Sequence, residues 1–197
     1  MFSFIKSIFQ APVTTPAAHF YVQQVVVPVV PAVASKPLPA IRFVMDESGI
    51  RKPLGEMFAQ GGEGVIHRMG DHGEIIAKIY HPEILSNPSR ALRLRCKIED
   101  MTGSTMLRSH ESLAWPKVSL QDESGVWCGY AMQLSKGRCF RSVFGNPYNL
   151  ATLAPHWHRQ HLVRICLDFL EVIEVLARNR AIPVDFNPSN FLAVCRT

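Results

Sequence analysis

Short apolar-rich runs bounded by turn residues predict β-strands through the first two thirds of the chain. The runs at 65–69 and 74–80 flank the turn residues of 70–73. Together with the preceding run at 53–60 they predict a three-stranded antiparallel meander. Two further strands are expected at 113–120 and 126–133, on either side of a polar turn. The run at 41–44 is compatible with one more short strand.

A period of 3.6 residues predicts a first helix between the third and fourth strands of this set. Asn87 or Ser89 can cap its free amides, and Gly103 ends it. Its other face is basic, and its apolar face contains Leu94, Ile98 and Met101.

The longest helical period lies at 155–180 and predicts a helix that faces the core. A loop at 182–185 and a short strand at 190–194 follow it. The apolar stripe of this helix contains Leu162, Ile165, Cys166, Phe169, Val172, Ile173 and Leu176.

Residues 1–40 differ from the rest because they are rich in proline, alanine, valine and threonine. The prolines interrupt any helix long enough to cross a bilayer, and no secretory signal pattern is present. We interpret 1–40 as an extended, poorly ordered leader and expect no membrane span. A membrane-surface or export role is the alternative.

The composition fits a folded domain, since 47% of the 197 residues are hydrophobic and 19% are charged. The formal charge of +5 is spread along the chain, with the densest basic segment at 90–97. No repeats of basic and aromatic residues accompany it, so no nucleic-acid partner is expected. The five cysteines form no CxxC pair, which predicts reduced thiols and a cytoplasmic location.

A glycine turn at 61–64 and a lysine at position 78 are the first candidates for chemistry. Glycines let backbone amides approach a phosphate closely, and Lys78 on a following strand can neutralise its charge. The pattern therefore indicates a phosphate site. An ordinary exposed lysine on a strand is the alternative for Lys78.

Asp185 and Asn190 are the second candidates, and they lie five positions apart around Asn187-Pro188-Ser189. One loop can present this acid towards an acceptor hydroxyl and this amide towards magnesium. A turn built on asparagine and proline is the alternative.

With these motifs the chain resembles the bacterial members of the eukaryotic-like serine/threonine protein kinases. The likeness is to the divergent group whose catalytic loop reads Gly-Asp-x-Asn-Pro-x-Asn, and it extends from Leu54 to the final residues. It implies an α+β, protein-kinase-like fold. A five-stranded antiparallel small lobe with one helix would occupy 41–134, and the first helical part of a large lobe would occupy 135–197.

The resemblance implies ATP and Mg²⁺ as cofactors and assigns roles around the phosphates. Gly62 and Gly64 match the first two glycines of the phosphate-covering loop, while His67 stands in the place of the third. Lys78 matches the phosphate-binding lysine. Glu99, on the following helix, is the candidate for the acid that pairs with it.

The remaining implied roles are contact with the adenine base of the nucleotide and the work of the catalytic loop. A hinge is implied near Met132, which would contact the nucleotide. Asp185 would be the catalytic aspartate and Asn190 the metal ligand, although Pro183 and Val184 replace the usual residues before the aspartate.

The chain ends at Thr197, before the Asp-Phe-Gly-like segment whose aspartate would hold the principal magnesium ion. We therefore expect an incomplete large lobe and leave open whether this chain alone transfers phosphate. The first hypothesis is an ATP-binding kinase-like domain, whose partners would be a protein substrate or a chain that completes the lobe. The alternatives are a non-catalytic binding or regulatory module and a basic adaptor for acidic partners.

Three histidines at 156–161 could offer metal ligands, because His158 and His161 share a helix face. No cysteine or carboxylate set completes such a site. We interpret them as residues of a solvated helix start.

Overall fold

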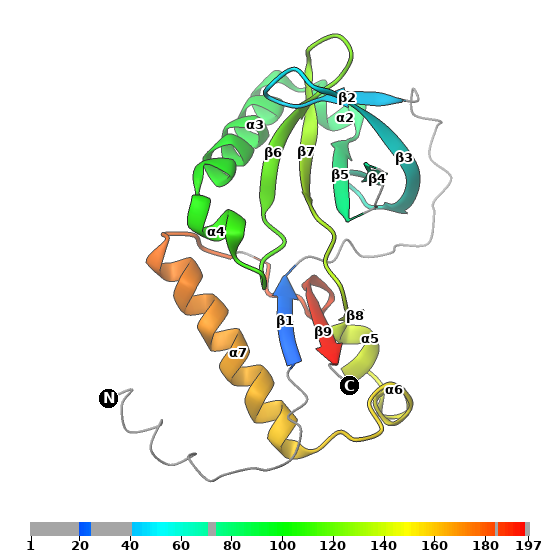
Figure 1. The fold of residues 1–197 in the computed structure, drawn as a ribbon, viewed down its shortest axis with the longest axis vertical. Helices are drawn as coiled ribbons and strands as arrows, with labels where there is room; N and C mark the ends of the chain where they lie inside the picture. Colours follow the sequence, from blue (N-terminus) through cyan, green and yellow to red (C-terminus); the bar gives the residue numbers. More distant parts are fainter. Residues whose placement is uncertain (1–19, 25–40, 71–73, 184, 196–197) are drawn as a thin grey trace.

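The computed structural model describes residues 20–24, 41–70, 74–183 and 185–195. Six strands form a closed antiparallel barrel, and a separate three-stranded sheet lies beside helix α7 (Figure 1). The leader predicted at 1–40 lies outside the described residues except for 20–24. The turn residues 71–73, Val184 and residues 196–197 also lie outside them.

The barrel strands follow one another in the order β2-β3-β4-β5-β7-β6, and every pair of neighbours is antiparallel. Their bounds are β2 (Phe43–Met45), β3 (Arg51–Gln60), β4 (Gly64–Met69), β5 (Ile75–Tyr80), β6 (Pro116–Gln121) and β7 (Trp127–Gln133). The predicted meander is confirmed as β3, β4 and β5. Lys78 lies on its third strand, as predicted.

The predicted kinase-like fold, a five-stranded small lobe followed by the first helical part of a large lobe, is wrong, because β2 closes the sheet into a barrel and β8 and β9 form a second sheet with β1. Val44 of β2 pairs with Lys52 of β3, and Met45 pairs with Gln121 of β6. A strand of three residues carries little alternation, so the sequence indicated its position but not its two partners. Pairing on both sides joins the two edges that an open sheet would expose.

Two turns of identical sequence, Asp-Glu-Ser-Gly, lead out of β2 and β6. In each, the aspartate Oδ1 accepts hydrogen bonds from the backbone N–H groups two and four residues later, at 2.8–3.0 Å. The glycine has a positive φ, 73° at Gly49 and 77° at Gly125. Asp46 and Asp122 therefore make the same local hairpin turn at two places.

A side chain of each turn also contacts a strand of the other hairpin at the closing edge of the barrel. Arg51 Nη2 lies 3.0 Å from Glu123 Oε1, which joins the start of β3 to the β6–β7 turn. Glu47 Oε1 accepts a hydrogen bond from the Ser119 amide of β6 at 3.3 Å. Side chains of both turns thus support the short pairing between β2 and β6.

The barrel interior is filled by buried side chains from β2, β4, β5, β6 and β7, with the half-buried Leu54 of β3 packed against them. Its buried members are Val44, Val65, Met69, Ala77, Ile79, Leu120, Cys128 and Ala131. Burial raises the pKa of the Cys128 thiol to about 12, so this thiol is protonated at neutral pH and behaves as a small apolar side chain.

Three helices follow β5: α2 (Pro82–Leu85), α3 (Pro88–Gly103) and α4 (Thr105–Ser109). The Asn87 side chain accepts a hydrogen bond from the Arg90 amide at 3.1 Å, which confirms the predicted cap of α3. Ile98 of α3 is buried against Tyr80, Ile84 and Trp127. Helix α3 runs alongside β6 on the outside of the barrel (Figure 1).

The three-stranded sheet outside the barrel combines segments from both ends of the chain. Strand β9 (Phe191–Cys195) lies between β1 (Phe20–Gln24) and β8 (Arg138–Cys139), and both pairings are antiparallel. Strand β1 falls within the segment interpreted as a leader. Around this sheet are α5 (Phe140–Phe144), α6 (Pro147–Leu153), α7 (Arg159–Arg178) and the 3₁₀ turn η1 (Pro188–Asn190).

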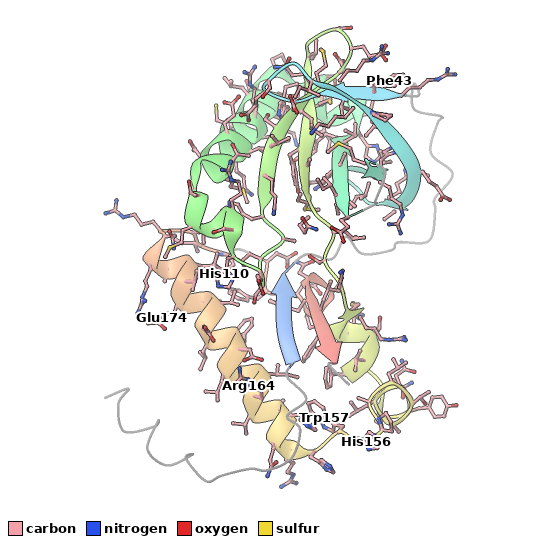
Figure 2. The ribbon with its side chains drawn as sticks, viewed as in Figure 1. Phe43, His110, His156, Trp157, Arg164 and Glu174 are labelled. Carbon is pink, nitrogen blue, oxygen red and sulfur yellow. The ribbon has the colours of Figure 1, made fainter. Side chains whose placement is uncertain are left out.

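Helix α7 confirms the predicted long helix, and its buried residues are Ile165, Asp168, Val172 and Leu176. It begins after His158, whose amide donates to His161 Nδ1 at 2.9 Å. Burial and the neighbouring His158 lower the pKa of His161. His156 and Trp157 lie at the end of α7 far from the barrel, whereas Glu174 lies nearer to it (Figure 2).

Two kinds of feature are absent from the described residues. They contain no group of three or more histidine, cysteine or carboxylate side chains placed to bind a metal ion. Within the same ranges, no helix combines the length and the apolar character needed to cross a membrane. Cys96, Cys128, Cys139 and Cys166 are free thiols.

Asp46 provides a test of barrel closure. Burial alone would raise its pKa, but hydrogen bonds from the Ile50 amide, the Lys52 ammonium and the Ser48 amide lower it below the ordinary value. Replacing Asp46 with alanine should reduce the free energy of unfolding at pH 7 by about 2 kcal/mol, measured by urea denaturation. Because a lowered pKa stabilises only the ionised form, this loss should shrink below about pH 4.

The matched control is Asp122→Ala, which removes the same turn hydrogen bonds from the hairpin that does not involve β2. We expect a smaller loss there. Equal losses in the two variants, or a difference that does not change with pH, would contradict the special role of Asp46 in closure.

Candidate functional site

A cavity of about 750 Å³ lies where the glycine turn, α3, β7 and the loop after α7 meet. The site residues predicted from the sequence line it, with the exceptions of Glu99 and His67. They are Gly62, Gly64, Lys78, Met132, Asp185 and Asn190. Segments more than 100 positions apart in the chain therefore contribute to one site.

The glycine turn joins β3 to β4 and is tied to the residue that follows β5. The Gly61 amide donates to the Gly64 carbonyl at 2.8 Å, which closes the turn. The His81 amide donates to the Glu63 carbonyl at 2.9 Å, and His81 Nε2 lies 2.9 Å from the Gly61 carbonyl. These contacts hold the turn's backbone over one end of β5.

The two predicted loop glycines serve different purposes. A Cβ on Gly64 would overlap the backbone of Ile79, so strand β5 can approach β4 this closely only beside a glycine. A Cβ on Gly62 would meet no atom of the described residues within 4 Å. Gly64 is thus required by the pairing of strands, while Gly62 leaves open space at the tip of the turn.

Lys78 points from β5 towards this turn. Its Nζ lies 3.2 Å from Glu63 Oε2 and 5.1 Å from the centre of the Tyr80 ring. The side chain is 18% exposed. Lys78 is therefore a partly buried cation in the cavity wall, unlike the ordinary exposed strand lysine that was the alternative.

Glu99 is not the partner of Lys78. It accepts a hydrogen bond from Arg95 Nε at 2.7 Å and lines a different cavity of about 460 Å³ together with Arg108 and Trp127. The face of α3 that lines the larger cavity carries Lys97 instead. Glu63, in the middle of the glycine turn, is the acid that pairs with Lys78, at 3.2 Å, and its place between two glycines was the available signal.

The resemblance gives His67 a place in the phosphate-covering loop and Met132 a place at the hinge. In the structure only Met132 lines the cavity. His67 lies on β4 with Nδ1 3.1 Å from the Gly55 carbonyl, and it does not line the cavity. Met132 lies on β7, is 1% exposed and packs with Ile66, Ile76 and Ala114. Met132 therefore forms part of an apolar wall.

Asp185 and Asn190 face each other across the loop that leads into β9. Asn190 Nδ2 donates to Asp185 Oδ2 at 2.8 Å and to the Asp185 carbonyl at 3.2 Å. Between them, the Asn187 side chain accepts a hydrogen bond from the Ser189 amide at 2.9 Å. The segment is thus an asparagine–proline turn and, at the same time, presents a carboxylate and an amide to the cavity.

Two tyrosines that sequence reasoning did not single out also line the cavity. Burial raises the pKa of Tyr80 to about 12, with a further contribution from the charge of Glu63. Burial, Tyr80 and Glu63 raise the pKa of Tyr130 as well. Both phenols are neutral at pH 7 and can donate hydrogen bonds. The other apolar lining residues include Leu94, Ile98, Met101, Leu113, Trp115, Leu176 and Ile182.

Comparison with known proteins adds no assignment. No family model matches the chain, and a search of curated proteins finds no matching sequence. The resemblance to the kinases accordingly stays a prediction.

Gly64 and Gly62 form a matched pair for testing the turn. Gly64→Ala should lower the free energy of unfolding by roughly 3 kcal/mol, because the added methyl group meets backbone that cannot move without disturbing β5. Gly62→Ala should change it by no more than about 0.5 kcal/mol. Chemical denaturation of both variants checks this, and similar stabilities would contradict the distinction.

Proposed function

We propose that this chain binds ATP in the large cavity. The observation that carries the proposal is the meeting of Lys78 with Asp185 and Asn190 around one apolar, aromatic-lined cavity. Cavities that bind small molecules have volumes of about 300–1,000 Å³ and combine apolar walls with a few converging polar groups. The cavity here has both properties.

The apolar part suits a flat heteroaromatic base. Met132, Ala114 and Ile98 offer side chains without charge, and Tyr130 adds an aromatic ring. A purine placed among such groups buries its faces, while neutral polar groups nearby can contact its edge.

The polar part suits phosphates. Lys78 is a cation at the cavity wall, and the open space at Gly62 lets a phosphate approach the backbone of the turn. A lysine binds phosphate as a point charge and does not require the planar geometry of an arginine. Charge neutralisation and close approach are both needed to hold a triphosphate.

The donor set of Asp185 and Asn190 fits Mg²⁺. Carboxylate and amide oxygens are hard ligands, and Mg²⁺ in nucleotide sites is held by one or two such groups, with phosphate oxygens and water completing its coordination. Asn190 would hold the ion, which when bound would neutralise charge on the phosphates, and the Asp185 carboxylate beside it would stay free to act on an acceptor hydroxyl. The Asn190 N–H bond to Asp185 orients both oxygens within one loop.

The simplest candidate is a protein that binds ATP without catalysis, which is a regulatory or binding module. A second candidate is phosphoryl transfer to a hydroxyl group. It is favoured by one observation, the presence of the Asp185 carboxylate in the same cavity as Lys78. We also propose a cytoplasmic location, which suits exposed free thiols such as Cys96 and Cys166.

Lys78→Met tests nucleotide binding. Loss of a charge-assisted contact to phosphate should weaken ATP binding about 10- to 100-fold, measured by calorimetry in the presence of Mg²⁺. The rise in melting temperature that MgATP gives the unaltered protein should shrink accordingly.

Lys117→Met is the matched control, because Lys117 lies on β6 and does not line the cavity. It should bind ATP like the unaltered protein. Failure of the unaltered protein to bind ATP at millimolar concentration would sink the proposal, as would equal binding by the two variants.

Asp185→Asn separates transfer from binding. If the protein transfers the terminal phosphate of labelled ATP, this variant should lower the rate at least about 100-fold, because a carboxamide cannot accept the hydroxyl proton. Absence of label transfer by a protein that binds ATP would reject the second candidate and leave the binding module.

A further inference from the structure

Glu63 bridges two cations that come from separate elements. Its Oε2 atom lies 3.2 Å from Lys78 Nζ on β5, and its Oε1 atom lies 3.7 Å from Arg90 Nη2 on α3. One carboxylate at the tip of the glycine turn thus occupies the space between a lysine and an arginine. Two cations that converge on one anion form a site for an anion.

The bridge is weakly held and can be exchanged. The side chains of Glu63 and Arg90 are 51% and 49% exposed, so water and salt screen their attraction, and such pairs contribute little to stability. A phosphate chain carries more negative charge than a carboxylate and presents more acceptor oxygens to the same cations. It should therefore compete successfully for them.

The backbone of the turn does not need to move in this exchange. His81 contacts the carbonyl groups of both Gly61 and Glu63, at 2.9 Å each. Rotation of the Glu63 side chain about its own bonds is enough to release Lys78 and Arg90. The space beside Gly62 is open to the incoming group.

We propose that Lys78 and Arg90 together form the polyphosphate subsite of this protein, and that Glu63 is its internal occupant, displaced when phosphate binds. The proposal rests on the proposed function for the identity of the attached nucleoside, but the subsite itself is defined by the two cations. In this subsite Arg90 binds phosphate together with Lys78. Glu63 lowers the affinity for every phosphate ligand, since each must first displace it.

Inorganic tripolyphosphate is the probe, because it contains the phosphate chain without a base. Its affinity is measured by calorimetry at fixed ionic strength for the full chain and for Glu63→Gln and Arg90→Gln. Glu63→Gln should bind tripolyphosphate about three- to tenfold more tightly, and Arg90→Gln should bind it more weakly by a similar factor.

Two controls account for the change in net charge. Glu56→Gln removes an exposed carboxylate from β3, and Arg93→Gln removes an exposed arginine from the same helix as Arg90. Both should stay within about twofold of the unaltered protein, since neither side chain belongs to the ion pairs that join Glu63 to Lys78 and Arg90. Urea denaturation of all four variants verifies that each is folded under the conditions of the titration.

The inference is overturned if Glu63→Gln fails to tighten tripolyphosphate binding, if Arg90→Gln behaves like Arg93→Gln, or if neither the full chain nor Glu63→Gln binds the probe. Parallel titrations with ATP keep the two proposals apart. ATP binding that depends on Lys78 but not on Glu63 or Arg90 would reject this subsite and retain the proposed function. The other outcome is that tripolyphosphate affinity changes as expected in Glu63→Gln and Arg90→Gln, while ATP binds no more tightly than tripolyphosphate. It would retain the subsite and reject the nucleotide.

Discussion

Closure of the barrel by β2 is the constraint on which the rest of the fold depends. All three residues of β2 pair with β3 on one side, and Met45 pairs with Gln121 of β6 on the other, so β2 joins the two edges of the sheet. Asp46 makes this possible because its buried carboxylate satisfies two amides of the following turn and pairs with Lys52 at 3.3 Å. Within the closed barrel, the strand that carries Lys78 pairs along its length with β4 on one side and β7 on the other.

Two glycines on neighbouring strands set the position of that strand. A Cβ at Gly64 would overlap the backbone of Ile79, and a Cβ at Gly129 would overlap the carbonyl of Lys78. Strand β5 therefore packs closely against β4 on one side and β7 on the other around Lys78. Positions that look like a flexible phosphate loop in the sequence are partly a requirement of strand packing.

The charges of the cavity are arranged around Lys78 and around the loop before β9. Glu63 extends the first group and links it to Arg90 on α3, which lies outside the cavity lining, while Asp185 and Asn190 form the second. Between them lie apolar and aromatic walls whose tyrosines stay neutral at pH 7. A ligand with a flat apolar part and an anionic chain matches this arrangement, which is the physical basis for proposing ATP.

The sequence by itself determined the local elements: the β3–β5 meander, the capped helix α3, the long helix α7 and the position of Lys78 on its strand. These follow from side-chain periodicity and turn chemistry, which act over a few residues. Only the tertiary structure decided that β2 closes a barrel, that β1 pairs with β9, and that Glu63 contacts Lys78 where Glu99 was expected. Each of these contacts depends on how packing brings separate elements or turns together. Side-chain periodicity reports only the local conformation of the chain, so it does not predict which distant segments meet.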